Sequence, residues 1–142
     1  MSADIFIPAR TSGHGQFTVD IDHEKAGWGY SGLRVVELEA GASQALETGD
    51  SELLVLPLAG SATVNVDGRD YELAGRPGVF QAVTDYLYVG RGKELTITSA
   101  AGGRFAFPSA VATKDLPTAY YPKETVRIDL RGAGDWSRQV KH

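Results

Sequence analysis

The chain has 142 residues, of which 42% are hydrophobic and 23% are charged, and it carries a net charge of −4 at pH 7 with no cysteine. This length suits one domain with a sizeable core. The acidic balance argues against nucleic-acid binding, and the lack of cysteine excludes disulfides, a thiolate nucleophile and a Cys-type zinc site. No apolar run is long enough to span a membrane, and residues 1–8 lack the pattern of a secretory signal. We therefore expect a cytoplasmic protein.

Short strands joined by Gly- and Pro-marked turns account for most of the chain. Residues 52–60 and 61–66 are two apolar runs that meet at a bend, and Asp67-Gly68 then leads into another strand. This pair predicts a hairpin with a type I′ turn, because both central residues of that turn need φ > 0. Residues 42–51 read as a polar loop or a poorly patterned strand. In chain order, the predicted strands are 16–22, 32–39, 52–60, 61–66, 69–73, 79–83, 86–89, 93–98, 104–107 and 125–130.

Alternation along these strands assigns side chains to two faces. In the first strand, Phe17, Val19 and Ile21 fall on the apolar face, whereas Asp20 falls on the polar face. No window has an apolar period of helical length, and the strand spacing favours an all-β sandwich or barrel. We expect the core to be formed by the following residues or their immediate neighbours: Val55, Val64, Phe80, Leu95 and Phe105.

A glycine-rich segment and two histidines are candidates for cofactor or metal binding. Residues 27–32 match the G-x-G-x-x-G pattern, but a polar stretch precedes them and a strand follows, whereas dinucleotide binding needs a strand before and a helix after. A glycine-rich turn is therefore the favoured interpretation. His14 and His23 with Glu24 could hold a metal if the N-terminal loop folded back. Metal sites need three or four convergent ligands, so two surface histidines are favoured.

Carboxylates that share a strand face are the remaining candidates for acid–base chemistry. Glu37 and Glu39 are spaced at i, i+2, as are Asp20 and Asp22. Such pairs usually form a solvated face, and nothing in the sequence supplies a cause for shifted pKa values. No G-x-S-x-G nucleophile elbow is present. The sequence thus predicts no catalytic residue from these patterns.

The glycine spacing resembles that of the cupins. Gly41 and Gly60 occupy the two glycines of the motif G-x5-H-x-H-x3-E-x6-G, and Gly92 occupies the inner glycine of the second cupin motif. Cupins use three histidines and a glutamate of these motifs to hold a divalent metal in the barrel mouth. The corresponding positions in this chain are Glu47, Gly49, Leu53 and Leu95. The resemblance therefore implies a single cupin-type, jelly-roll-like β-barrel without a metal site.

Several segments further resemble the amino-terminal half of the 5-deoxy-glucuronate isomerase family, the two-cupin sugar-acid isomerases of inositol catabolism. They are residues 26–28, 53–66, 85–90 and 126–140. The last is the most specific, because the family joins its two barrels through Arg-Gly-x-Gly-x-x-x-Arg-x-Val. Here that run is formed by Arg131, Gly132, Gly134, Arg138 and Val140. Gly90 is a departure, since relatives tend to carry proline there.

This resemblance implies a domain plan. Residues 1–130 would form a cupin-like barrel lacking metal ligands, and residues 131–142 a linker toward a second cupin domain that is absent from this chain. The family holds its metal in the carboxy-terminal barrel, so a divalent, Zn-like ion is expected only there. A small sugar acid would then be isomerised, in aldose–ketose fashion, by the full-length enzyme. Alone, this chain would be inactive.

Two alternatives remain open. The chain could be a stand-alone, metal-free cupin that binds a small molecule or mediates dimerisation through its sheets. Its pocket would then be lined by Glu47, Leu53, Tyr88 and Leu95. The other alternative is a metal cupin that uses His14 and His23. Neither a nucleic acid nor a membrane is expected as a partner.

Overall fold

The computed structural model describes residues 17–21, 31–131 and 138–141, and these contain no α-helix. The all-β prediction is confirmed. No helix in the described ranges could cross a membrane. A single 3₁₀ turn spans Lys123–Thr125. The strands are β1 (Phe17–Ile21), β2 (Ser31–Leu38), β3 (Ala42–Glu47), β4 (Ser51–Val66), β5 (Arg69–Arg76), β6 (Tyr86–Val89), β7 (Glu94–Ser99), β8 (Gly103–Val111), β9 (Ala119–Tyr121), β10 (Ile128–Arg131) and β11 (Arg138–Lys141).

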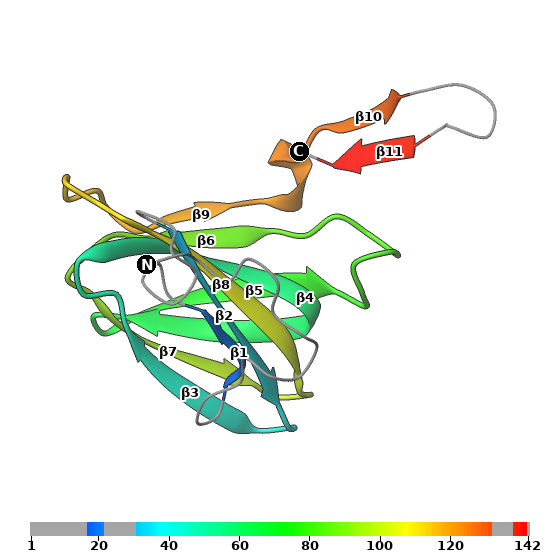
Figure 1. The fold of residues 1–142 in the computed structure, drawn as a ribbon. Helices are drawn as coiled ribbons and strands as arrows, with labels where there is room; N and C mark the ends of the chain where they lie inside the picture. Colours follow the sequence, from blue (N-terminus) through cyan, green and yellow to red (C-terminus); the bar gives the residue numbers. More distant parts are fainter. Residues whose placement is uncertain (1–16, 22–30, 132–137, 142) are drawn as a thin grey trace.

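Nine strands form one hydrogen-bonded sheet that folds over itself through β4 (Figure 1). The first half of β4 lies in the layer β1-β2-β8-β4-β6-β9, and its second half pairs with β5 and β7 in the other layer. The register shifts between Pro57 and Ala59 and between Gly60 and Ala62. The predicted bend is therefore present, but it lies inside one continuous strand rather than between two.

Backbone atoms approach very closely where β4 changes layer. Gly60 has φ +95°, and a Cβ atom there would lie 2.6 Å from the Gly102 carbonyl oxygen. Gly75 on β5 has φ +68°, and its Cβ would lie 1.7 Å from the Gly60 carbonyl oxygen. Only glycine combines positive φ with such proximity at little cost. These contacts set the corner of the barrel.

The inner faces of the two layers enclose one apolar core. Four of the predicted core residues, Val55, Val64, Leu95 and Phe105, are at most 2% exposed, so these predictions are confirmed. The core comprises Val36, Leu38, Leu46, Leu53, Val55, Ala62, Val64, Val66, Leu73, Leu87, Val89, Leu95, Ile97, Phe105 and Phe107.

Phe80 is the core prediction that is wrong, because its side chain is 94% exposed. Residues 79–83, predicted as a strand, form a turn and an irregular segment. The Gln81 N–H donates to the Gly78 carbonyl at 3.2 Å, which closes the turn. The Arg76 guanidinium donates to the Ala82 carbonyl at 3.0 Å and so holds the segment against the end of β5. Local turn contacts replace ladder bonds here.

The buried carboxylate of Asp85, 1% exposed, ties three parts of the chain together. It accepts the backbone N–H groups of Ala74 and Gly75 at 2.8 and 2.9 Å, and the Tyr120 hydroxyl at 2.5 Å. The Thr84 hydroxyl is a further donor at 3.3 Å. A carboxylate with several donors is stable in the interior, because each bond offsets part of its desolvation. Asp85 thus holds β9 to the corner of the barrel.

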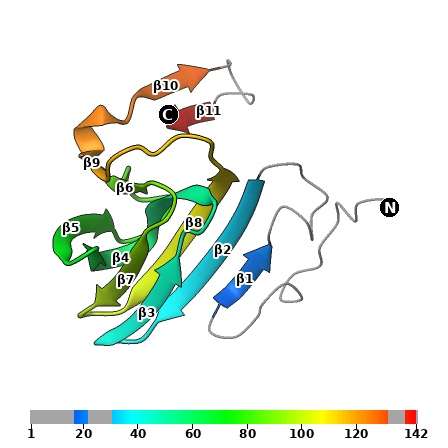
Figure 2. The ribbon, with the colours of Figure 1, turned by 90° about the vertical axis from the view of Figure 1, so that its left-hand side faces the viewer.

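The remaining elements differ from prediction mainly at their boundaries. Residues 42–47, predicted as a loop or a poor strand, form β3 and pair with β7. The Asp67-Gly68 hairpin is confirmed, with φ of 49° and 87°. The strand predicted over 125–130 begins only at Ile128, after the 3₁₀ turn, and pairs with β11 in a separate ribbon that lies outside the barrel (Figures 1 and 2).

A pair of glycine substitutions tests the corner. Gly75→Ala should reduce the free energy of unfolding by at least ~4 kcal/mol or prevent folding, because the methyl group overlaps a carbonyl oxygen. Gly49→Ala is the matched control: it has φ +59° but nothing within 4 Å, so it should cost only about 1 to 2 kcal/mol. Urea unfolding measures both values. Equal losses of unfolding free energy in the two variants would show that the close contact between Gly75 and Gly60 does not determine the effect of the substitution.

Candidate functional site

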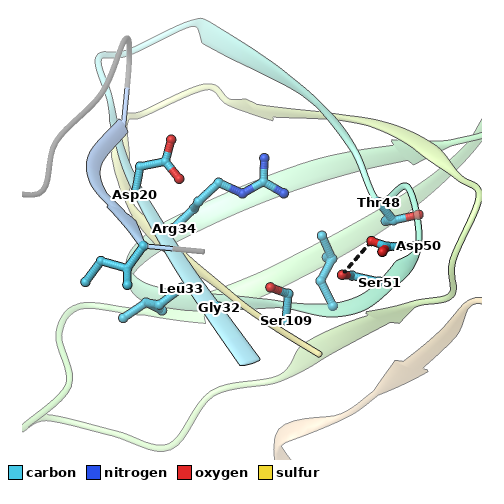
Figure 3. Close-up of a pocket in the computed structure, with 10 residues that line it drawn as sticks. Asp20, Gly32, Leu33, Arg34, Thr48, Asp50, Ser51 and Ser109 are labelled. Carbon is cyan, nitrogen blue, oxygen red and sulfur yellow. Dashed lines mark hydrogen bonds between the residues drawn. The ribbon is translucent and has the colours of Figure 1, made fainter. Parts of the chain in front are cut away.

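A hollow of about 280 Å³ lies at one end of the barrel, between β1, β2, β4 and β8 on one side and the turn after β3 on the other (Figure 3). Asp20 and Arg34 project into it from one side, and Thr48, Asp50 and Ser51 lie across from them. We call this hollow the barrel mouth. Its lining consists of Asp20, Ile21, Gly32, Leu33, Arg34, Thr48, Asp50, Ser51, Leu53 and Ser109.

A β-bulge in β1 brings Asp20 to the inside. Phe17 pairs with Val36, but Val19 pairs with Val35, so the register shifts at Thr18. Cross-strand partners share a face of the sheet. Phe17 and the residues after the shift therefore do not alternate as predicted: Asp20 lies opposite Arg34, on the inner face. The predicted common face of Phe17, Val19 and Ile21 is wrong, because the bulge reverses the alternation.

Arg34 is an inward-facing cation. Its partner across the sheet is Phe107, a fully buried core residue, so the Arg34 side chain leaves β2 on the inner face. The Arg34 guanidinium carbon lies 5.4 Å from the centroid of the Phe17 ring. A cation near an aromatic face is stabilised by the ring quadrupole. Because the ring offers no strong hydrogen-bond acceptor, Phe17 positions the guanidinium without satisfying its N–H donors.

A row of small side chains continues the mouth beside Arg34. Gly32 pairs with Ser109, which in turn pairs with Leu53 on β4, so these three lie on one line across the inner face. Gly32 contributes no side chain, and this leaves space above Ser109. Leu53 is 2% exposed and separates the mouth from the core. The floor of the hollow is therefore apolar, and its walls carry hydroxyl groups.

The turn after β3 forms the opposite wall. Thr48 is buried, and its hydroxyl donates to the Gly90 carbonyl at 2.9 Å and accepts the Lys93 N–H at 2.8 Å. These bonds fix the turn against residues 90–93. Ser51 donates to Asp50 at 3.4 Å, a contact drawn in Figure 3. The exposed Asp50 carboxylate thus faces the mouth from a turn that is anchored by a buried side chain.

The predicted pocket residues line several different hollows. Leu53 lines the mouth, and with Tyr88 it also lines a second hollow of about 350 Å³. Glu47 is exposed and lies opposite Glu94, beside a shallow depression that Leu95 also lines. Leu95 itself belongs to the core. Of the four cupin ligand positions, Leu53 and Leu95 therefore lie in the core, Glu47 is exposed, and Gly49 lies in the turn after β3.

The described residues do not fit a metal ion. Residues 17–21, 31–131 and 138–141 contain no group of three His, Cys, Asp or Glu side chains close enough to bind one. Glu37, half of a predicted carboxylate pair, instead accepts from Arg104 at 2.6 Å. The candidate ligands His14 and His23, Asp22 and most of the 27–32 segment lie outside the described residues.

Two phenols are held by carboxylates. The Tyr88 hydroxyl donates to Glu52, and burial together with this bond raises the pKa of Tyr88 from 10.0 to about 12. The hydrogen bond from Tyr120 to Asp85, aided by burial, raises the pKa of Tyr120 to about 12 as well. Both phenols therefore stay protonated at neutral pH and act as hydrogen-bond donors.

Sequence reasoning missed Arg34 and Ser109, and it assigned Asp20, as part of a carboxylate pair, to a solvated face. For Arg34 and Ser109 a signal existed, because each has the same strand parity as a core residue, Val36 and Phe107 respectively. In β2 the alternation that would have assigned Arg34 to the inner face is obscured, because the consecutive residues Val35 and Val36 are both apolar. For Asp20 the alternation of apolar and polar residues indicated the wrong face, because no residue in 17–21 marks a β-bulge.

The amino-acid sequence matches a known protein family and its curated relatives. The profile of the KduI/IolB family matches residues 5–142. The 5-deoxy-glucuronate isomerase of Geobacillus kaustophilus is 28% identical over 138 residues, which are 96% of this chain and 50% of that protein. The family resemblance seen in the sequence is thereby confirmed.

Two solved structures superpose on most of this chain. An IolB-like protein from Salmonella typhimurium superposes with a TM-score of 0.83 at 26% identity, over 92% of this chain and 50% of that one. A cupin protein from Bacteroides fragilis reaches a TM-score of 0.53 at 16% identity, over 79% of this chain and 92% of that one. The second likeness shows the fold alone, and it confirms the cupin-type barrel.

The raised phenol pKa values predict two late titrations. In the folded protein, phenolate absorbance followed after rapid mixing to alkaline pH should show Tyr88 and Tyr120 ionising at about 12. Tyr88→Phe and Tyr120→Phe should each remove one of these phenols, and the double variant both. Because the folded values exceed the ordinary 10.0, their contribution to stability is complete below pH 10 and is lost as the pH rises toward 12. Titration of both phenols near 10 would contradict these contacts.

Proposed function

Because this chain belongs to the KduI/IolB family, we propose that it forms one barrel of a two-barrel isomerase that acts on a sugar acid. The observation that carries the proposal is the extent of the match. The chain spans about half the length of the curated relatives it matches. One of them, the 5-deoxy-glucuronate isomerase of Geobacillus kaustophilus, aligns over 96% of the chain. We further propose that the barrel corresponds to the amino-terminal half, and that the reaction belongs to inositol catabolism in the cytoplasm.

The reaction in this proposal is an aldose–ketose isomerisation. A proton moves between two neighbouring carbons while the carbonyl shifts from one to the other, and a divalent ion assists by polarising the carbonyl oxygen. The described residues of this barrel do not fit such an ion, because Leu53 and Leu95 are core residues and Glu47 faces away from the mouth. We therefore assign the metal-dependent step to a second barrel.

Arg34 and the two phenols held by carboxylates support a role of this barrel in binding rather than in proton transfer. Arg34 contributes a guanidinium group, which only donates hydrogen bonds. Tyr88 and Tyr120, with pKa values of about 12, are too weakly acidic to exchange a proton readily at neutral pH. The barrel thus offers donors and a fixed positive charge to a ligand, and contributes structure to the larger enzyme.

An activity assay with two preparations tests the proposal. The 142-residue chain, supplied with Zn²⁺ or Mn²⁺ and 5-deoxy-glucuronate, should show no isomerisation above a metal-only blank when followed by proton NMR. The same chain joined to the half of the Geobacillus kaustophilus enzyme that it does not match should restore turnover, at least tenfold above the blank. The intact Geobacillus enzyme is the positive control.

Two results would contradict this assignment. Turnover by the chain alone would place the metal chemistry within it. A joined protein that folds and binds zinc, but leaves the substrate unchanged, would show that this barrel does not serve as half of the isomerase.

A further inference from the structure

We propose that the barrel mouth is a binding site for a monosaccharide that carries a carboxylate, with Arg34 as the residue that recognises the acid group. The choice of a sugar acid rests on the proposed function, whereas the site itself rests on the geometry of the mouth. The site is separate from the metal-dependent step assigned above, because the mouth contains no group of metal ligands among the described residues.

Arg34 supplies the recognition of charge. Its side chain leaves β2 on the inner face, opposite the buried Phe107, and the ring of Phe17 lies 5.4 Å from its guanidinium carbon. A guanidinium presents its N–H donors as a planar fork that matches both oxygens of a carboxylate. A cation inside a protein opening also acts at lower effective dielectric than one on an open surface, so its attraction for an anion is stronger.

The other walls suit hydroxyl groups. Ser51 and Ser109 carry hydroxyls that both donate and accept, and the Asp50 carboxylate accepts only. A sugar hydroxyl can donate a hydrogen bond to the Asp50 carboxylate and at the same time accept one from a serine hydroxyl. Asp20, opposite Arg34, adds a carboxylate beside the cation. An acid without hydroxyl groups would face the Asp50 carboxylate with nothing to donate, which favours a hydroxylated acid over a plain one.

Size limits the ligand to a single sugar. The mouth encloses about 280 Å³, slightly below the range of roughly 300 to 1,000 Å³ that is usual for small-molecule pockets. Its floor is Leu53 and its centre is open because Gly32 has no side chain. An apolar floor with polar walls matches a sugar ring, which has carbon-bound hydrogens on its faces and hydroxyls at its edge.

Calorimetric titration of the 142-residue chain tests the site, with D-glucuronate and D-glucose as probes. The two sugars differ in that glucuronate has a carboxylate where glucose has a hydroxymethyl group. We expect glucuronate to bind with a Kd in the millimolar range or below, and glucose to bind at least tenfold more weakly. Adipate, an acid without hydroxyl groups, should also bind at least tenfold more weakly.

Substitutions then assign the interaction. Arg34→Gln should weaken glucuronate binding at least tenfold, because it removes a charge-assisted hydrogen bond. Arg104→Gln is the matched control, since Arg104 is exposed on β8 and pairs with Glu37 outside the mouth; it should leave binding unchanged. If Arg34→Gln fails to fold, Ser109→Val serves as the second variant, with an expected loss of several-fold.

Any one of three results would overturn the proposal. The unsubstituted chain could fail to bind glucuronate, it could bind glucose equally well, or a folded Arg34→Gln or Ser109→Val variant could bind glucuronate fully. None of them depends on turnover. Loss of isomerase activity with intact glucuronate binding would contradict the proposed function alone, and activity without binding in the mouth would contradict this inference alone.

Discussion

Close packing of glycine backbones at the corner of the barrel is the constraint on which the fold depends. Strand β4 serves two layers, and it can turn from one to the other only where Gly60 meets Gly75 and the Gly102–Gly103 segment without side chains between them. Asp85 then accepts the N–H groups of Ala74 and Gly75, next to that contact. The corner is therefore stabilised by backbone geometry and by one buried charge, while the apolar core fills the space that the corner creates.

A second irregularity gives the barrel a polar opening. The bulge at Thr18 turns Asp20 inward, and the parity of β2 does the same for Arg34, although their neighbours along the inner faces are core residues. Charges at such positions cost desolvation free energy, which a fully apolar lining would avoid. Their position at the open end, beside Gly32 and Ser109, reduces that cost because water or a polar ligand can reach them.

The sequence predicted the architecture well because strand alternation, turn glycines and the Asp-Gly hairpin are local signals. Prediction from the sequence failed where tertiary contacts determine the local structure. Phe80 was assigned to the core from its apolar neighbours, yet the bonds of Arg76 and Gln81 hold its segment as a turn. The site was the least predictable part. The cupin motif marked the turns at Gly41 and Gly60. Of the positions it offers as ligands, however, Leu53 and Leu95 lie in the core and Glu47 is exposed. The bulge that builds the mouth has no sequence signature.

The exposure of Phe80 has a consequence for cleavage of the chain. An aromatic residue that is 94% exposed in a segment without strand pairing is accessible to chymotrypsin, which cuts after such side chains. A cut there separates β1–β5 from β6–β11, yet β4 of the first fragment pairs with β6, β7 and β8 of the second. The two pieces interleave in both layers and share one core. A nicked molecule would thus remain assembled, and the barrel is a natural scaffold for a split reporter or for circular permutation at this turn.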